Sequence, residues 1–533
     1  MSRILVIGGY GGFGARLSRR LLAAGHDVLV AGRSAERAAA FCAGLAGAEP
    51  VVADRAQGIG LVLARERPDL VIDAAGPFQA SGYTVPEACI AMRVPYLDLA
   101  DGRAFVTGIG ALDRAAKAAG VAVVSGASSV PALSGAVARA LGAGLPRVDQ
   151  VEIAISASGR ATAGASVSAA ILSYAGKPVR LWRGRREAQG FGCQELRRER
   201  FGAAGRRWIA LAEIPDYDLL PAALPGCPSV IFRAGNDLGF QMIALWLASW
   251  PVRWGWAASL SGAAAWLLPL QRLSGRAGGE RSAMQVVVKG SRVERRWTLV
   301  ASKGDGPEIP TLATALIAEE ILAGRVTPGA RDASRLLALA QFEPAFAGLA
   351  IRHETVERVA PPLYARAMGE RFDALPAAVR DMHDFNGDGG AAGEGEVVRG
   401  THPLARLMGR IVRFPPSGSY PLHVSFAERG GVETWTRRFG PHRFASQLSR
   451  RGDCVVERFG PMRFAFALPS DGQGLEMTLR RWSVFGVPLP LWLAPRITGR
   501  EWQEDGSFRF LVEIRAPLIG EVVRYAGWLA RVV

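Results

Sequence analysis

Lysine, cysteine and histidine are all scarce in this chain of 533 residues, and each scarcity excludes a class of protein. Lysine occurs at only four positions, so the formal net charge of +16 is an excess of arginine. The arginines are spread along the chain without the aromatic interleaving of RNA- or DNA-binding motifs, so we expect no nucleic-acid partner. The five cysteines are odd in number and lack C-x-x-C spacing, and the six histidines lack metal-ligand spacing. We therefore expect no disulfide framework, no metal site and a reducing, cytoplasmic compartment.

Long uncharged runs are also rare, with one exception at residues 238–271, where Arg253 is the only formal charge. The segment contains five tryptophans, and Pro251 and Pro269 break it into halves of about 15 to 17 residues, short of the roughly 20 that a spanning helix needs. Two interpretations stay open. The halves dip into one leaflet from the inner face of the membrane as a peripheral contact, or they form a helical pair that docks on the rest of the chain or on a second copy. A first strand at residue 4 leaves no room for a signal peptide.

A glycine motif opens the chain. Residues 4–7 form an apolar run typical of a buried strand, and Gly9, Gly11 and Gly14 follow as G-x-G-x-x-G before a helical pattern over residues 15–24. We expect Gly9 to permit the tight turn, Gly11 to let a pyrophosphate approach the backbone, and Gly14 to let helix and strand pack closely. The predicted cofactor contacts of this turn are Gly8, Gly9, Tyr10, Gly11, Gly12, Phe13 and Gly14.

The second predicted strand, residues 27–31, indicates which dinucleotide binds. An NAD site would carry Asp or Glu at its end, whereas this chain has Arg33 and Ser34, with Arg37 one turn later. A guanidinium can bind a 2′-phosphate through two hydrogen bonds, so the sequence favours NADP over NAD. The alternative is that Arg33 is one more arginine of an arginine-rich surface.

Regular alternation of strands and helices continues to about residue 135. It predicts an α/β Rossmann-type, doubly wound parallel sheet. Asp54, after the third strand, is expected near the adenine. The fourth strand, residues 70–73, runs into a turn of small residues where the nicotinamide ribose is expected to lie: Ala74, Ala75, Gly76 and Pro77. Further strands are predicted over residues 95–99 and 121–125.

Five segments in this order resemble the saccharopine dehydrogenase-like oxidoreductases: the glycine motif, Ala31-Gly32-Arg33-Ser34, Ala75-Gly76-Pro77-Phe78, Tyr96-Leu97-Asp98-Leu99 and residues 125–131. The resemblance covers residues 1 to about 350 and implies cofactor roles for Gly9, Gly11, Gly14, Arg33, Ala75 and Gly76. The chain departs from the family pattern in two places. Asp73 stands where relatives often have Asn, and Ala100-Asp101 stands where they often have Gly-Glu.

After residue 135 the pattern changes to an α+β substrate domain over residues 136–307. A helix opening at Pro310 and the residues up to 350 are expected to return to the nucleotide-binding domain, so that domain would be discontinuous. The acidic turn at residues 215–221 is interpreted as a solvated loop, with a substrate contact as the alternative.

Residues 355–533 resemble a domain of unknown function that often follows such modules. A helix is predicted over residues 363–382 and a glycine-rich loop over 386–396; short alternating segments then predict a mainly antiparallel β domain. Phe439-Gly440-Pro441-His442-Arg443-Phe444 recurs at residues 459–464, as equivalent strand-end turns would. The aromatic side chains either fill a core, which we favour, or line an apolar pocket. Residues 384–389 copy half of a calcium loop but lack its Glu at position 12, which argues against calcium.

These patterns predict an NADP-dependent oxidoreductase that transfers hydride to or from a small-molecule substrate, apolar or lipid-like in character. Candidates to polarise or protonate the substrate are the polar residues after the fifth and sixth strands: Asp98, Asp101, Ser128 and Ser129. Tyr174 and Lys177 are one residue too close for the Tyr-x-x-x-Lys pair of short-chain reductases. The alternative is a non-catalytic, NADP-bound carrier or scaffold for an apolar ligand at a membrane surface.

The Arg33→Ala variant tests the choice of cofactor. Removing the guanidinium should weaken NADPH binding about tenfold or more and leave NADH binding nearly unchanged, because only NADPH carries the 2′-phosphate. Fluorescence titrations with both cofactors measure the two affinities. A preference for NADPH that stays as large as in the parent would contradict the role of Arg33.

Overall fold

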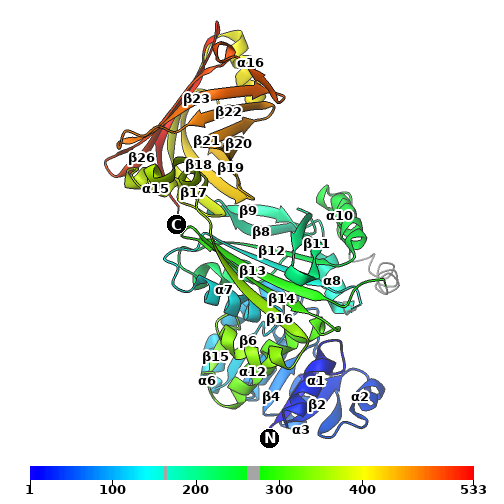
Figure 1. Ribbon diagram of the computed structural model, residues 1–533. Coiled ribbons are helices and arrows are strands. Elements are labelled where there is room, and N and C mark those ends of the chain that lie inside the picture. Colours follow the sequence, from blue (N-terminus) through cyan, green and yellow to red (C-terminus); the bar gives the residue numbers. More distant parts are fainter. Residues whose placement is uncertain (161–164, 261–276, 533) are drawn as a thin grey trace.

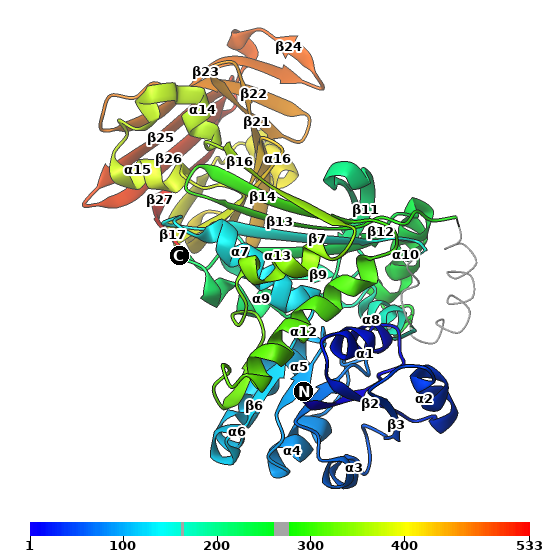
Figure 2. The same ribbon diagram turned by 60° about the horizontal axis from the view of Figure 1, so that its bottom comes forward.

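A computed structural model describes residues 1–160, 165–260 and 277–532, and it stacks three sheets on one another (Figure 1). The strands of the first, middle and third sheets follow one another along the chain, except that residues 329–332 return to the first sheet before residues 351–359 complete the middle one. Figure 2 shows the same succession, with α12 between the first sheet and the middle sheet.

The first sheet is parallel, with the strand order β15-β6-β5-β4-β1-β2-β3. Helices cover both faces, because alternate residues of β1 enter two hydrophobic clusters: Ile4 and Val6 face α1 and α12, whereas Leu5 and Ile7 face α3, α4 and α6. This confirms the predicted doubly wound sheet. The strands are β1 (Arg3–Ile7), β2 (Asp27–Gly32), β3 (Ala48–Val52), β4 (Leu70–Asp73), β5 (Tyr96–Asp98), β6 (Ala122–Ser125) and β15 (Gly329–Asp332). The helices are α1 (Gly14–Ala23), α2 (Ala35–Cys42), α3 (Ile59–Glu66), α4 (Thr84–Ala91), α5 (Arg103–Gly108), α6 (Asp113–Ala119) and α12 (Ile309–Leu322).

The middle sheet has the order β10-β11-β12-β7-β13-β14-β16, in which only β7 and β12 pair in parallel. One hydrophobic cluster runs from Ile4 in the first sheet to Ile153 and Trp297 in this one, so the two share a core. Its strands are β7 (Gln150–Ala157), β10 (Arg197–Arg200), β11 (Arg206–Leu211), β12 (Ser229–Asn236), β13 (Ser282–Gly290), β14 (Val293–Ala301) and β16 (Ile351–Val359). A separate hairpin and the helices complete this part: β8 (Pro178–Arg183), β9 (Arg186–Phe191), α7 (Ser134–Gly142), α8 (Ala165–Tyr174), α9 (Asp216–Leu219), α10 (Gly239–Arg253) and α13 (Glu343–Ala347).

The helix α10 forms the first half of the tryptophan-rich segment. Met242, Ser249 and Val252 are buried against the protein, whereas Phe240 and Leu247 on the outer side are each 57% exposed. Residues 261–271 of the predicted apolar segment lie outside the described residues. In the described parts of the chain no helix is both long enough and apolar enough to cross a bilayer.

The C-terminal strands form a closed antiparallel barrel. The order is β22-β21-β20-β19-β18-β17-β27-β26-β25-β23-β24, and a further pairing of β22 with β23 closes a ring of ten strands. Its elements are β17 (Asp388–Arg399), β18 (Gly418–Arg429), β19 (Val432–Phe439), β20 (His442–Arg451), β21 (Cys454–Phe459), β22 (Met462–Ala467), β23 (Gly474–Val484), β24 (Val487–Leu489), β25 (Arg496–Glu504), β26 (Ser507–Ala516), β27 (Gly520–Arg531), α14 (Leu363–Met368), α15 (Ala377–His383) and α16 (Pro403–Val412). The mainly antiparallel β fold predicted for this domain is confirmed.

Two local predictions for this domain were wrong. The glycine-rich loop is part of strand β17, and its glycines make room for neighbours: a Cβ on Gly393 would lie 2.1 Å from the carbonyl oxygen of Trp528. A Cβ on Gly395 would lie 2.7 Å from the ring of Phe439. The predicted helix over residues 363–382 is broken into α14 and α15 by a short 3₁₀ turn, Gly369–Phe372, which lets both pieces pack on the barrel.

The repeated Phe-Gly-Pro motif forms the turns of two hairpins, β19–β20 and β21–β22. Phe439 pairs with His442 and Phe459 pairs with Met462, so Gly and Pro are the two central residues of each turn. Gly440 and Gly460 both have φ of +53°, the conformation that the first central position of a type II′ turn needs.

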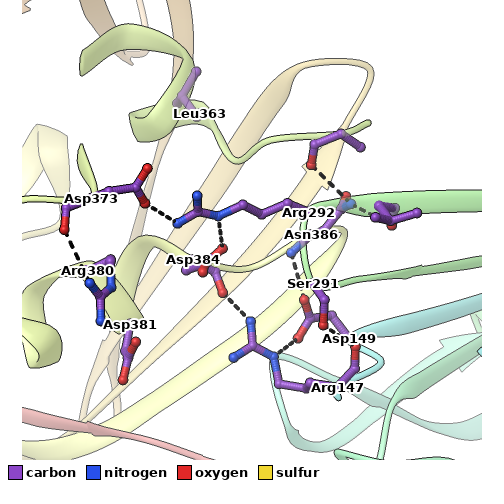
Figure 3. Close-up of polar contacts among 12 residues, drawn as sticks. Arg147, Asp149, Ser291, Arg292, Leu363, Asp373, Arg380, Asp381, Asp384 and Asn386 are labelled. Atoms are coloured by element: carbon purple, nitrogen blue, oxygen red, sulfur yellow. Dashed lines mark hydrogen bonds and ion pairs between the residues drawn. The ribbon is translucent and has the colours of Figure 1, made fainter. Parts of the chain in front are cut away.

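The half calcium motif lies at the junction between the barrel and the middle sheet (Figure 3), and its side chains hold protein partners. Asp384 pairs with Arg292, whose Nε lies 3.3 Å from Oδ1 of Asp384. The Asn386 amide donates to the carbonyl oxygens of Val293 and Ala360 at 3.2 and 3.3 Å. The motif therefore joins two domains.

The same junction buries the carboxylate of Asp149 among three arginines. Its Oδ1 lies 2.9 Å from Arg147, 3.1 Å from Arg531 and 3.6 Å from Arg185, and its Oδ2 accepts the backbone N–H of Asn386 at 2.9 Å. The Asp149 side chain is fully buried, so water cannot take the place of its carboxylate beside the arginines if the carboxylate is removed.

The Asp149→Ala variant should lose about 3 kcal/mol of unfolding free energy, because it leaves buried arginines without their counter-charge. Urea denaturation measures the loss, and limited proteolysis should cut the chain between the middle sheet and the barrel. Asp373→Ala is the matched control. It removes the ion pair between Asp373 and Arg292 at the same junction. Because the Asp373 side chain is 61% exposed, the loss should be less than about 1 kcal/mol. Equal losses for both variants would contradict the role of Asp149.

Candidate functional site

The glycine loop after β1 leaves its backbone open at the start of α1. Gly8 makes the sharp turn with φ of +77°, a role that we predicted for Gly9. Gly9 is needed for space, since a Cβ there would lie 2.8 Å from the carbonyl oxygen of Val6. A Cβ on Gly14 would lie 2.1 Å from the carbonyl oxygen of Gly8, so this glycine lets the helix approach the strand.

The side of this loop where we expect a pyrophosphate to bind carries no obstruction. A Cβ on Gly12 would meet no atom within 4 Å, and one on Gly11 would meet only the carbonyl oxygen of Gly8, at 3.1 Å. The first turn of α1 contains no acidic residue, and Phe13 precedes it without a side-chain cap. The helix therefore offers free N–H groups and the positive end of its dipole to an anion.

Tyr10 connects this loop to the end of β2. Its hydroxyl accepts the backbone N–H of Ser34 at 3.1 Å, and its ring lies 4.9 Å from the guanidinium carbon of Arg37. The Ser34 hydroxyl accepts the backbone N–H of Arg37 at 3.2 Å and so caps α2. Arg33 and Arg37 are both exposed at this edge. Of the residues predicted to bind a 2′-phosphate, Arg33 and Arg37 are thus exposed, and Ser34 caps the helix.

Beyond β3, Asp54 and Arg55 behave differently from each other. The Asp54 carboxylate accepts the backbone N–H of Ala56 at 2.9 Å, so it stabilises its own turn. Arg55, which the sequence did not single out, reaches past the end of β1 to the turn after β4. Its Nη2 lies 2.9 Å from the carboxylate of Asp73, and its Nη1 donates to the carbonyl oxygen of Ala75 at 2.6 Å. Burial raises the pKa of Asp73 to about 7, and Arg55 opposes that shift.

Arg55 thereby fixes the turn where the nicotinamide ribose is expected. It also donates to the Ser81 hydroxyl at 3.2 Å and lies over the ring of Phe78. Ala74, Ala75, Gly76 and Pro77 are held between β4 and this arginine, beside the glycine loop, since a Cβ on Gly8 would lie 3.1 Å from Ala75.

Asp98, predicted as a catalytic candidate, is fully buried and supports a neighbouring turn. Its Oδ1 accepts hydrogen bonds from the Ser125 hydroxyl at 3.0 Å, the Gly126 N–H at 2.8 Å and the Ala100 N–H at 2.9 Å. Burial raises the pKa of Asp98 to about 6, against the effect of these hydrogen bonds. This geometry gives Asp98 a positioning role for the loops after β5 and β6.

Asp101, after β5, is less buried than Asp98. Its Oδ1 accepts the side-chain amide of Gln79 at 3.0 Å, and burial raises its pKa above the ordinary value. Burial raises the pKa of Tyr174, on α8, and the negative charge of Asp101 adds to that shift. Ser128 is buried and Ser129 half-buried at the start of the turn after β6.

The acidic segment at residues 215–221, interpreted from the sequence as a solvated loop, is instead helix α9 and part of the domain interface. Asp218 accepts two hydrogen bonds from Arg103, at 2.6 and 2.5 Å, and Arg103 also donates to the carbonyl oxygen of Arg180 at 2.6 Å. Asp216 is fully buried and accepts the Ser134 hydroxyl at 2.5 Å. The sequence could not show these partners, because they lie about a hundred residues away.

The saccharopine dehydrogenase NADP binding domain matches residues 4–124. The match falls on the first sheet, from β1 into β6. A second match, to the domain of unknown function DUF4166, covers residues 375–529 and so falls on the C-terminal barrel. Both resemblances expected from the sequence are confirmed, and the NADP-binding domain supports an oxidoreductase that uses a nicotinamide cofactor.

Solved structures with a similar arrangement share little sequence. A saccharopine dehydrogenase (L-Glu forming) from Saccharomyces cerevisiae is 14% identical, with a TM-score of 0.45, over 67% of this chain and 100% of that one. An amine dehydrogenase from Mycobacterium smegmatis is 13% identical, with a TM-score of 0.38, over 63% of this chain and 95% of that one. No curated protein sequence matches the chain.

The buried Asp216 makes stability depend on pH. Burial raises its pKa from 3.8 to about 7, so the folded protein holds this proton more tightly than the unfolded chain does. The stabilising contribution is present below about pH 4 and is lost as the pH rises through about 7. Between pH 5 and pH 8 the parent should therefore lose more stability than Asp216→Asn, which cannot ionise. Urea unfolding at both pH values measures this, with the exposed Asp453→Asn as control. Parallel pH profiles for the parent and Asp216→Asn would contradict the assignment.

Proposed function

We propose that this protein is an NADP-dependent oxidoreductase that transfers hydride to or from an apolar small molecule. The observation that carries the proposal is the open backbone at Gly11 and Gly12, in line with α1 and flanked by Arg33 and Arg37. In this arrangement the N–H groups of the loop bind the pyrophosphate and the two arginines bind the 2′-phosphate. The bound cofactor would supply the reducing equivalents.

The residues around the turn after β4 would orient the substrate. Arg55 and Asp73 hold Ala75 and Gly76 in place, so that small side chains line the nicotinamide side of the groove. Asp101 is the proton-holding group at this edge, because its raised pKa keeps more of it protonated than an exposed carboxyl would be. Asp98 and its partners fix the loop on which Ser128 and Ser129 lie, and the substrate domain closes over them through Arg103 and Asp218.

An apolar substrate and a peripheral membrane location are supported by the outer face of α10. Phe240, Ile243, Leu247 and Trp254 recur at helical spacing on this face, and each is between 38% and 57% exposed. Tryptophan with aliphatic residues on one helix face is typical of helices that lie in a membrane interface. The same face also fits the second candidate, an NADP-bound carrier that holds an apolar ligand without converting it.

The Asp101→Asn variant distinguishes these functions. NADPH should bind it as tightly as the parent, whereas turnover should fall about a hundredfold, because the amide cannot give up a proton. Fluorescence titration measures binding, and stopped-flow absorbance of the reduced nicotinamide, with a cell lipid extract as substrate pool, measures turnover. The exposed Asp505→Asn is the control. Bound NADPH that is never oxidised by the parent would favour the carrier, and absence of NADPH binding would remove both.

A further inference from the structure

A hollow of about 480 Å³ at one end of the C-terminal barrel is lined by cationic side chains. Arg399 comes from the end of β17, Arg410 and Arg413 from the end of α16 and the residue after it, and His442 and Arg443 from the start of β20. Figure 1 shows α16 at the far end of the barrel from the middle sheet. The hollow is therefore distant from the nucleotide-binding loop.

The four arginines of this hollow have no carboxylate within ion-pair distance in the described part of the chain. Other arginines of the barrel do have one, as Arg437 does with Glu457 and Arg515 with Glu513. Arg399 donates through Nη2 to the carbonyl oxygen of Arg406, at 3.0 Å, while its buried Nε has no partner. Gathering like charges without counter-charges is unfavourable, and an anion in the hollow would relieve it.

The local sequence makes this gathering feasible. A Cβ on Gly409 would lie 1.8 Å from Nη2 of Arg399, so glycine at this position leaves room for that guanidinium against α16. The first copy of the repeated turn motif brings His442 and Arg443 to the rim, whereas Met462 and Arg463 of the second copy lie on the β21–β22 hairpin and do not line the hollow. The repeat thus supplies a natural internal control.

The helix beside the hollow presents an apolar face to solvent. Leu404, Leu407 and Ile411 lie three and four residues apart on α16 and are 51%, 52% and 72% exposed. Ala405 and Gly409 are buried toward the barrel. A helix with an aliphatic outer stripe between arginines has the pattern of helices that lie on anionic membranes, with the apolar side chains at the boundary of headgroups and acyl chains.

We propose that this end of the C-terminal domain binds the surface of a bilayer rich in anionic phospholipid. The side chains of Leu404, Leu407 and Ile411 enter the interface, and the phosphate of one headgroup enters the hollow, where it accepts hydrogen bonds from Arg410, Arg413 and Arg443. Arginine suits this role because its planar guanidinium binds phosphate through two parallel hydrogen bonds. This site is independent of the hydride-transfer proposal and of α10.

Co-sedimentation of the full chain with vesicles tests the proposal. We expect binding to phosphatidylcholine vesicles containing 30% phosphatidylglycerol to exceed binding to pure phosphatidylcholine at least tenfold, and to weaken as salt is raised. The Arg410→Gln/Arg413→Gln/Arg443→Gln variant should lose about a hundredfold in affinity for the anionic vesicles, at roughly fivefold per arginine. Leu407→Gln/Ile411→Gln should also weaken binding, because it removes the inserting face.

The single variants Arg443→Gln and Arg463→Gln are the matched pair, since they change the same position of the two motif copies. Only Arg443→Gln should weaken vesicle binding, and circular dichroism should show both variants folded. Equal vesicle binding by the parent and the triple variant would overturn the proposal. Tight calorimetric binding of inorganic phosphate without vesicle binding would overturn it as well, because it would assign the hollow to a free anion.

Discussion

A buried carboxylate that needs cations around it determines how the C-terminal barrel fits onto the middle sheet. Asp149 lies at the start of β7, the central strand of the middle sheet, and draws in Arg147 beside it, Arg185 from the β8–β9 turn and Arg531 from the end of the last strand. Arg531 comes from the C-terminal end of the chain, whereas the other three lie within residues 147–185. Because desolvated charges must be paired to be tolerated, the C-terminal barrel is fixed on the middle sheet as a part of one body.

Buried carboxyl groups have a similar effect at the nucleotide edge of the first sheet. Asp73 and Asp98 end adjacent parallel strands, and each holds a turn by accepting hydrogen bonds or an ion pair from groups outside its own strand. The turns that these carboxyl groups organise surround the place where the nicotinamide ring is expected. Rigid turns at the carboxyl ends of parallel strands are what a cofactor groove requires, since the cofactor itself must move in and out.

The C-terminal barrel uses its polar interior and its surface for different purposes. Inside, Arg437 is paired with Glu457 and Ser446, and His383 with Glu501, so these groups are compensated within the domain. At the end carrying α16 the arginines are left uncompensated, next to exposed leucine and isoleucine. The charges inside the barrel are paired, whereas those at the rim are not. This contrast supports the rim as the surface through which the domain binds an anionic partner.

The sequence by itself determined the features that depend on neighbouring residues. Strand periodicity, the glycine motif and the two hairpin turns are local, so the doubly wound sheet, the antiparallel C-terminal domain and the family resemblance were predicted correctly. Which residues contact the cofactor, and that the cofactor is NADP and not NAD, stay predictions. The features that depend on contacts between residues far apart in the sequence were decided only by the tertiary structure. Arg55 holds Asp73, Arg103 binds Asp218, and Asp98 supports a turn. It also showed that the glycines of residues 386–396 belong to a strand. Glycine is typical of loops and of tightly packed strands alike, and only the neighbouring chain, here Trp528 and Phe439, distinguishes the two.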